Sequence, residues 1–208
     1  MSDQGSAEWL AERCGKVTAS RIGDLMAKTK TGWGASRANY KAELIAERLT
    51  KAPAERYTND AMAWGTQTEP DARAAYSFHV NRDVEQVGFI PHPSIAMSGA
   101  SPDGLVGTDG LVEIKCPKTA THIDSLLDAS IDRKYVLQMQ WQMECTGRKW
   151  CDWVSFDPRL PDDMQLLVKR VARDDDMLAE VRAAVCDFLA EVDATVAALL
   201  AKYRKEAA

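Results

Sequence analysis

Two acidic residues and a lysine in the middle of the chain have the types and spacing needed for metal-assisted hydrolysis. Asp103 stands beside Gly104, whose backbone freedom permits a sharp bend, and Glu113, Ile114 and Lys115 follow in one strand-like run. Strand side chains alternate between faces, so Glu113 and Lys115 project to one side while Ile114 points into the core. A hairpin that returns to Glu113 brings the two carboxylates together.

This arrangement predicts a hard divalent cation. Neighbouring carboxylates repel each other unless a cation holds them, and oxygen ligands without His or Cys favour Mg²⁺ or Mn²⁺. We expect Asp103, Glu113 and the backbone carbonyl of Ile114 as ligands. Two Mg²⁺ ions are expected, for which Mn²⁺ can substitute.

The matching reaction is hydrolysis of a phosphodiester, which needs an activated water and positive charge around the transition state. Lys115 either positions or helps to deprotonate the water, or only neutralises charge, and we expect it to position the water. The plain alternative is an ordinary Pro-Asp-Gly turn followed by an ordinary half-exposed strand.

Composition predicts one cytoplasmic domain. The 208 residues, 46% of them hydrophobic, suit a single domain spanning 1–208. The five cysteines are dispersed and form no CxxC pair, which is typical of reduced thiols rather than of a zinc ribbon or a disulfide framework. The sequence has no export signal and no run of roughly eighteen apolar residues, so we expect no membrane insertion.

The charge is unevenly distributed. The net charge of −5 does not favour indiscriminate binding to DNA, but residues 13–51 hold nine basic and three acidic residues, and 9 − 3 gives +6. Such a segment is either a solvated surface or a site for a polyanion. Its context favours DNA.

Hydrophobic periodicity predicts an α/β fold with a central mixed β-sheet flanked by helices. Thr18 is expected to cap a helix that contains Ile22, Leu25 and Met26, and Pro70 either opens or kinks another. Further helices are expected around Tyr40–Leu49, at Ala61–Phe78, at Thr121–Thr146 and at about 174–204. A strand meander is expected at Val84–Ile90, Ile95–Ser98 and Gly110–Lys115, with later strands at Trp150–Phe156 and Leu166–Val171.

The last predicted helix carries an apolar stripe that either covers the core or mediates assembly. We expect it to cover the core.

Five blocks of sequence, in order, resemble the lambda-type (YqaJ-like) viral recombinase exonucleases, and Pro102-Asp103 with Glu113-Ile114-Lys115 resembles the PD-(D/E)xK nuclease signature. The resemblance covers roughly residues 9–160 and implies a restriction-endonuclease-like fold. The blocks are Arg13 with Val17-Thr18-Ala19-Ser20, Ala63 to Glu69, Gly99 to Leu105, Glu113 to Pro117, and Tyr135 with Gln138-Met139-Gln140.

The resemblance adds two residues to the expected catalytic site. Glu69 is implied as a further acid around metal-bound waters, and Gln138 as a group that assists at the nucleophile. Because Gln140 and Gln142 flank Gln138, the alternative is an ordinary surface amide.

A site for a 5′-phosphate is also implied, at Arg13, Ser20 and Ser101. Ser20 stands in the first turn of the helix predicted after Thr18, where backbone amides and the helix dipole favour an anion, and Arg13 can hold phosphate with two hydrogen bonds. Simple helix capping is the alternative for Ser20. A terminal-phosphate pocket predicts dependence on 5′-phosphorylated ends.

Met62 matches the position at which family members insert an apolar side chain between the strands, although a methionine is otherwise core filler. The preceding Asn59-Asp60 lacks a cation that some relatives have there. Strand separation is therefore assigned to Arg37, Lys28 or Lys30.

The implied function is a Mg²⁺-dependent 5′-to-3′ exonuclease on double-stranded DNA, leaving 3′ single strands for phage-type recombination. The resemblance also implies a homotrimeric ring, a single-strand annealing protein as partner, and a phage or prophage origin in a bacterial host. One alternative is another PD-(D/E)xK nuclease, either an endonuclease or a RecB-like enzyme with an iron–sulfur cluster, against which the cysteine spacing argues. The other is a non-catalytic scaffold that binds DNA ends, against which the intact Asp103, Glu113 and Lys115 argue.

Overall fold

A five-stranded mixed sheet forms the centre of the protein. The computed structural model describes residues 3–30, 32–54, 59–128 and 130–204. The strand order is β10-β9-β8-β7-β4, with β8 and β9 parallel and the other pairs antiparallel. The bounds are β4 Val84–Glu85, β7 Gly104–Val106, β8 Gly110–Lys115, β9 Trp150–Phe156 and β10 Leu166–Ala172.

The central strands β8 and β9 are buried on both faces, as their nearly continuous apolar character requires. Their register pairs Glu113 with Trp153 and Lys115 with Ser155, so these four side chains share one face. Ile114 and Val154 pair on the opposite face. The predicted strands at Gly110–Lys115 and Trp150–Phe156 are confirmed.

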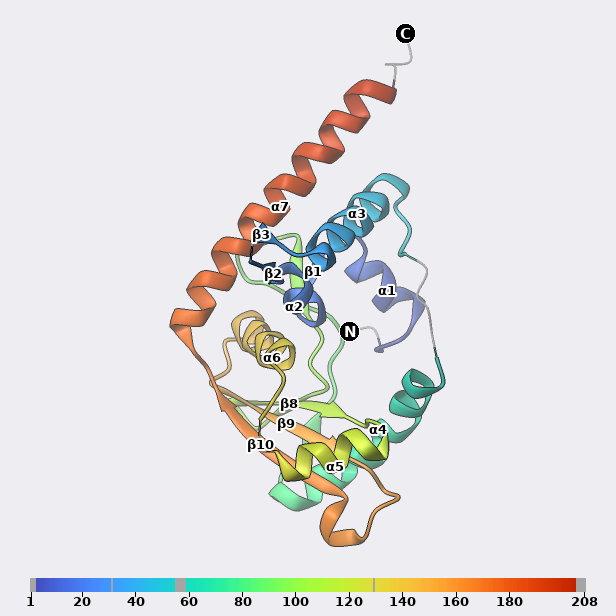
Figure 1. Ribbon diagram of the computed structural model, residues 1–208, viewed down its shortest axis with the longest axis vertical. Coiled ribbons are helices and arrows are strands. Elements are labelled where there is room, and N and C mark those ends of the chain that lie inside the picture. The colour runs from blue at the N-terminus through green and yellow to red at the C-terminus, as the bar shows by residue number, and fades with distance from the viewer. Residues whose placement is uncertain (1–2, 31, 55–58, 129, 205–208) are drawn as a thin grey trace.

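Helices cover the two faces of the sheet (Figure 1). α4 (Asp60–Val80) packs Ala72 and Tyr76 against the face of Ile114 and Val154, and it continues through Pro70 without a break. α5 (Thr119–Leu127) and α6 (Arg133–Thr146) cover the other face. Pro70 therefore does not open the helix.

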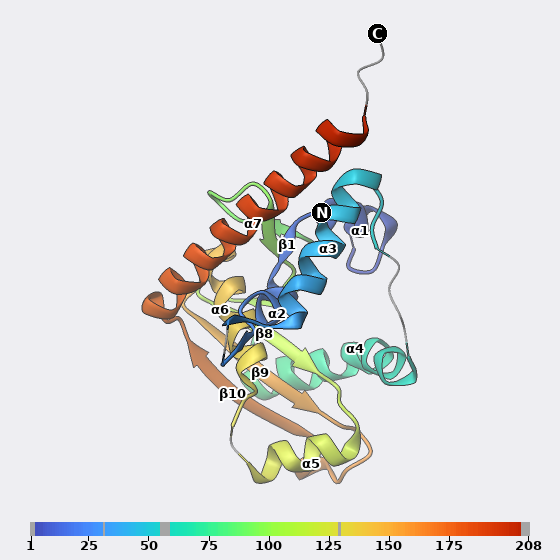
Figure 2. The ribbon, with the colours of Figure 1, turned by 45° about the horizontal axis from the view of Figure 1, so that its top comes forward.

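A second core lies on the far side of α6, where α6 packs against η1, α2 and α7, and α3 packs along α7 (Figures 1 and 2). Tyr40 of α3 stacks on Phe188 of α7, with 5.5 Å between ring centroids. A small sheet of order β1-β6-β5 lies beside this core. The bounds are α1 Ala7–Arg13, β1 Val17–Thr18, η1 Ala19–Arg21, α2 Ile22–Leu25, α3 Ala35–Thr50, β5 Ile90–Pro91, β6 Ser98–Ala100, η2 Asp162–Met164 and α7 Asp175–Tyr203.

The long predicted C-terminal helix is confirmed as α7, whose N-cap Asp174 accepts from Met177 N. Its stripe is buried from Leu178 to Val192, so this part covers the core as expected. The end of the helix runs past the rest of the molecule, and Tyr203 is 70% exposed (Figure 1). No helix within the described ranges is long and apolar enough to cross a membrane.

Two predicted elements are divided in the structure. The predicted strand Val84–Ile90 is split between β4 and β5 because the chain leaves one sheet and enters the other. The predicted helix Thr121–Thr146 becomes α5 and α6, because Asp128 and Asp132 accept from the backbone amides of Ser130 and Lys134 between them.

Two smaller predictions need correction, and one short hairpin was not predicted. The predicted strand Ile95–Ser98 is displaced to β6, which begins at Ser98. The hairpin consists of β2 (Lys28–Thr29) and β3 (Gly32–Trp33). The helix predicted after Thr18 is only the turn η1 followed by the four-residue α2, and Thr18 makes no side-chain cap.

Candidate active site

The hairpin of β7 and β8 brings together the three residues predicted to do the chemistry. Asp103 directly precedes β7, and its Oδ2 accepts from the backbone amide of Ile114 at 2.6 Å. Ile114 lies between Glu113 and Lys115, whose side chains form an ion pair on the α6 face. The predicted cluster is therefore assembled.

Glu113 is only 1% exposed, and both of its carboxylate oxygens accept hydrogen bonds. Its Oε1 accepts from Lys115 Nζ and from Gln138 Nε2 at 2.7 Å, and its Oε2 accepts from Gln142 Nε2 at 2.6 Å. Gln138 and Gln142 lie one helical turn apart on α6 and so present the same face. Gln138 is thus a part of this cluster and not a surface amide.

Negative charge exceeds positive charge in the cluster. Burial raises the pKa of Asp103 well above its usual value, and the charge of Glu113 raises it further. Burial lowers the pKa of Lys115, but Glu113 and Asp103 outweigh this effect and raise it above the ordinary value. Two carboxylates therefore have one ammonium group between them, and a further cation would relieve their repulsion.

The donors in this cluster fit Mg²⁺. No three His, Cys, Asp or Glu side chains gather into a complete metal cage within the part of the chain that the structure describes. Mg²⁺ does not need such a cage, because it keeps several waters and uses one or two carboxylates. Asp103, Glu113 and the Ile114 carbonyl would supply oxygen donors beside the uncompensated charge.

Glu69 lies at the edge of this cluster. It forms an ion pair with Arg73 one turn along α4, and Arg73 Nε donates to the backbone carbonyl of Asp103 at 3.3 Å. Glu69 also adds to the upward shift in the pKa of Asp103. Its neighbour Cys116 has its pKa raised to about 12, by burial first and then by Glu69 and Asp103, so its thiol stays protonated.

Residues predicted to bind phosphate meet in a second place. Arg13 Nη1 donates to Ser101 Oγ at 3.1 Å, and the Arg13 guanidinium lies 4.0 Å from the centroid of the Trp9 ring. Arg13, Ser20 and Met62 line one cavity of about 280 Å³. We call this space the phosphate cavity.

The phosphate cavity also contains cations that the sequence analysis did not select. Lys16 and Arg21 line it. Arg21 is paired with Asp24 and Glu43, which reduces its attraction for an anion. Met62 is 50% exposed in the first turn of α4, so it is a surface residue and not core filler.

Two expectations about DNA contacts need correction. Arg37 is only 4% exposed, donates to the Leu25 carbonyl at 3.1 Å and pairs with Glu191, so it holds α3 to α2 and α7. Ser20 was expected at the N-terminus of a helix whose dipole favours an anion. Because α2 is a single turn, it provides little dipole for that purpose. Lys28 and Lys30 are exposed on the β2–β3 hairpin, and neither lines the phosphate cavity.

Sequence reasoning missed Gln142, Arg73 and Trp9. Gln142 carried a usable signal, because it lies four residues after Gln138. Arg73 likewise lies four residues after Glu69. Trp9 Nε1 donates to Ser101 Oγ at 3.0 Å across 92 positions of sequence, and no local pattern predicts such a contact.

Known proteins resemble this chain over most of its length. The family model of the YqaJ-like viral recombinase domain matches residues 8–149. The chain is similar to the crystal structure of an alkaline exonuclease from Laribacter hongkongensis, with 52% identity, 95% of this chain and 97% of that chain covered, and a TM-score of 0.89. The same enzyme in complex with dAMP gives the same values.

A more distant structure supports the fold alone. A phage-related exonuclease from Haemophilus somnus 129PT is 14% identical, with 88% of this chain and 96% of that chain covered, and has a TM-score of 0.73. No curated protein matches the chain. The predicted PD-(D/E)xK-like fold is thus confirmed.

Proposed function

Because the chain belongs to the YqaJ-like viral recombinase family, we propose that it is a Mg²⁺-dependent nuclease that degrades the 5′-terminated strand of double-stranded DNA. Family membership and the 52% identical exonuclease support a nuclease of phage-type recombination. The observation that carries the proposal is the cluster of Asp103, Glu113 and Lys115.

The residues of the cluster divide the work of hydrolysis. Asp103 and Glu113 would hold Mg²⁺, which when bound would supply positive charge at the scissile phosphate and make the attacking water more acidic. Lys115 carries an ammonium group beside these carboxylates, and it donates a hydrogen bond that orients the attacking water. Gln138 and Gln142 hold Glu113 in place.

The phosphate cavity supports the direction of digestion. Arg13 is positioned by Ser101, which lies two residues before Asp103, so a phosphate bound at Arg13 is close to the cluster. A strand anchored by its 5′-phosphate presents its next phosphodiester for hydrolysis, and each cut creates a new 5′-phosphate. Met62 at the rim can separate the two strands.

We also propose the cellular setting from the resemblance. The 3′ single strands would be passed to a single-strand annealing protein, and three copies would form a ring around the DNA. The enzyme would act in the cytoplasm of a bacterial host of phage or prophage. Analytical ultracentrifugation tests the trimer, and copurification with the annealing protein tests the partner.

The deciding experiment compares linear duplex DNA with 5′-phosphate ends, linear duplex with 5′-hydroxyl ends, and closed circular DNA, each with Mg²⁺. We expect mononucleotides from linear DNA only, faster from phosphorylated ends. Asp103→Ala should reduce release by at least about a thousandfold. Unchanged release by this variant rules out the site, and cleavage of circular DNA indicates an endonuclease.

Arg13→Ala tests the phosphate cavity separately. Loss of a charge-assisted contact should slow hydrolysis of phosphorylated ends by about tenfold to a hundredfold. The Mg²⁺ dependence should stay unchanged, and the exposed Arg82→Ala serves as the matched control. An equal loss on hydroxylated ends contradicts the assignment.

A further inference from the structure

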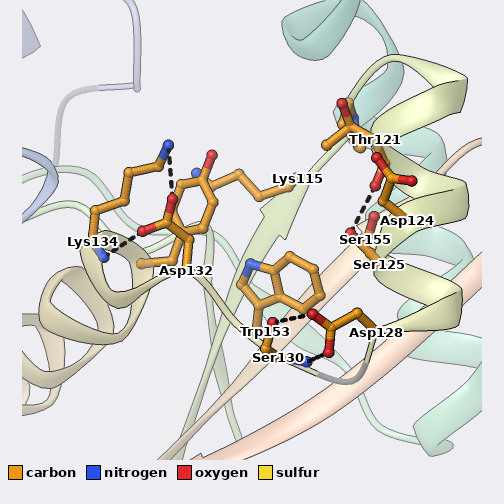
Figure 3. Close-up of a pocket in the computed structure, with 12 residues that line it drawn as sticks. Lys115, Thr121, Asp124, Ser125, Asp128, Ser130, Asp132, Lys134, Trp153 and Ser155 are labelled. Carbon is orange, nitrogen blue, oxygen red and sulfur yellow. Dashed lines mark hydrogen bonds and ion pairs between the residues drawn. The ribbon is translucent and has the colours of Figure 1, made fainter.

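A second cavity, of about 450 Å³, opens beside Lys115 on the Glu113 face of the sheet. Trp153 of β9 lies between Asp124 of α5 and Lys134 of α6 (Figure 3). Tyr135 of α6 also lines the cavity. We call this space the α5 cavity. Lys115 lines this cavity and also pairs with Glu113, so the cavity adjoins the catalytic cluster.

The catalytic cluster separates the α5 cavity from the phosphate cavity. Arg13 bonds Ser101, Asp103 follows two residues later and bonds the amide of Ile114, and Lys115 then lines the α5 cavity. Figure 2 shows α1 and α3 above β8 and α5 below it. A strand anchored at Arg13 and cut at Asp103 therefore continues toward the α5 cavity.

Trp153 offers a hydrogen bond that the protein does not use. The residue is only 4% exposed, and its Nε1 has no acceptor within residues 3–30, 32–54, 59–128 and 130–204. A buried donor that lacks an acceptor is costly, and Trp153 lines the α5 cavity, so an acceptor on an occupant that reaches Nε1 would remove this cost. Such an occupant would carry a hydrogen-bond acceptor, and a ring nitrogen or carbonyl oxygen of a nucleobase is one that fits.

The aromatic walls favour a flat occupant. The rings of Tyr135 and Trp153 lie 6.5 Å apart between centroids, with 32° between their planes. Lys115 and Lys134 place their ammonium groups 5.2 and 4.8 Å from the centroid of the Tyr135 ring. Aromatic side chains in such places bind nucleobases by stacking.

Charge distinguishes the two ends of the cavity. Lys115 provides an ammonium group at the cluster, whereas Asp124 and Asp128 provide carboxylates on the α5 side. Carboxylates repel phosphate but accept hydrogen bonds from the amino groups of bases and the hydroxyl of a sugar. The cavity thus suits one nucleoside and not a run of phosphates.

We propose that the α5 cavity binds the base of the second nucleotide from the 5′ end, the nucleotide whose phosphate is attacked. This inference rests on the proposed function. The base stacks on Tyr135 and accepts from Trp153 Nε1, and its phosphate lies beside Lys115. The contact holds the strand on the far side of the cut while the first nucleotide leaves.

The test is a coupling cycle in single-turnover hydrolysis of a 5′-phosphorylated duplex with Mg²⁺. The substrate has either a normal or an abasic second nucleotide, and the enzyme is either wild type or Trp153→Phe. We expect each single change to slow the first cut by about fivefold to tenfold. The double change should be no slower than the slower single change, because both remove one contact.

Matched controls isolate the cavity. Trp150→Phe alters the same strand on the other face of the sheet, and an abasic sixth nucleotide alters the DNA away from the cut. Neither control should change the rate. Circular dichroism tests whether Trp153→Phe is folded, and the wild-type comparison of the two substrates does not depend on that variant.

Two outcomes overturn the inference. One is equal cutting of normal and abasic substrates by the wild type, and the other is a double change whose losses multiply. Failure of the proposed function has a different signature, because the wild type would then not release nucleotides from an intact phosphorylated duplex.

Discussion

Two buried carboxylates on neighbouring strands face opposite sides of the sheet and have opposite surroundings. Glu113 of β8 is 1% exposed and shares one ammonium group with Asp103, which leaves negative charge uncompensated. Asp152 of β9 is 2% exposed and accepts from Tyr76 Oη at 2.7 Å and from two nitrogens of Arg170 at 2.8 and 2.9 Å. Its charge is therefore fully matched.

The comparison shows that burial alone does not identify a functional acid. Both carboxylates have all their hydrogen bonds from the protein, and both lie in the central strands. What differs is the sum of the charges, which would favour a cation beside Glu113 and leaves Asp152 already matched by Arg170. We therefore assign the proposed chemistry to Glu113 and a structural role to Asp152.

The largest effect should come from Glu113→Gln. Removal of a charge proposed to hold Mg²⁺ should reduce nucleotide release from linear duplex by about a thousandfold or more. The melting temperature without metal should fall less than in Asp152→Asn, because the relief of repulsion at Asp103 offsets the lost pairing with Lys115. Calorimetry in EDTA measures the melting temperature, and a release assay measures the rate of hydrolysis. A large loss of stability would show that Glu113, like Asp152, mainly stabilises the fold.

Asp152→Asn should give the opposite result. The variant loses the paired hydrogen bonds to Arg170, which should cost about 2 kcal/mol in the free energy of unfolding. Hydrolysis per folded molecule should stay within about twofold. Urea unfolding measures the cost, and a thousandfold loss of hydrolysis would show that Asp152 takes part in the chemistry.

Gln142→Leu sharpens the comparison within the Glu113 site. Glu113 Oε2 loses its donor and can rotate, so we expect about a tenfold slower rate and a higher Mg²⁺ concentration for half-maximal rate. Gln140→Leu is the matched control, because Gln140 bonds Ala172 and Asp174 instead. If both variants change the Mg²⁺ requirement equally, Gln142 does not position Glu113.

The smallest effect concerns a third buried acid, Asp157, at the end of β9. Burial raises its pKa, but hydrogen bonds from Arg159 and Thr119 outweigh this and lower the pKa to about 2. Its contribution to stability is therefore present above the unfolded pKa of about 4 and is lost as the pH falls toward 2. We expect about 1 kcal/mol, because Arg159 is partly exposed.

Denaturation of the wild type and Asp157→Asn from pH 6 to pH 2 measures this contribution. The difference should be constant above about pH 5 and narrow below about pH 4. A difference that grows in acid would show that the pair with Arg159 does not stabilise the ionised form.

Local patterns predicted the catalytic cluster because its residues lie close in sequence. Strand alternation placed Glu113 and Lys115 on one face, and the hairpin signal placed Asp103 beside them. The resemblance supplied Gln138 through its register. The sequence therefore contained this cluster almost completely.

Distant contacts could not be predicted. Arg37 was assigned to DNA because Asn59-Asp60 lacks a cation that some relatives have there. Its actual partner, Glu191, lies 154 positions away, and no local pattern indicates that contact. The split of Val84–Ile90 depends on which sheet each end joins, and alternation does not encode that choice. Trp153 looked like an ordinary strand residue in the sequence. Only the packed structure shows that its Nε1 lacks an acceptor.

Helix α6 fixes the distance between the phosphate cavity and the catalytic cluster of the proposed enzyme. This helix carries the side-chain amides of Gln138 and Gln142 that bind Glu113. It also packs against η1, which carries Ser20 of the phosphate cavity. The span between the anchoring point and the cutting point is therefore built into the backbone. How much strand is removed in each cycle would be a property of the fold, the same for every sequence of bases.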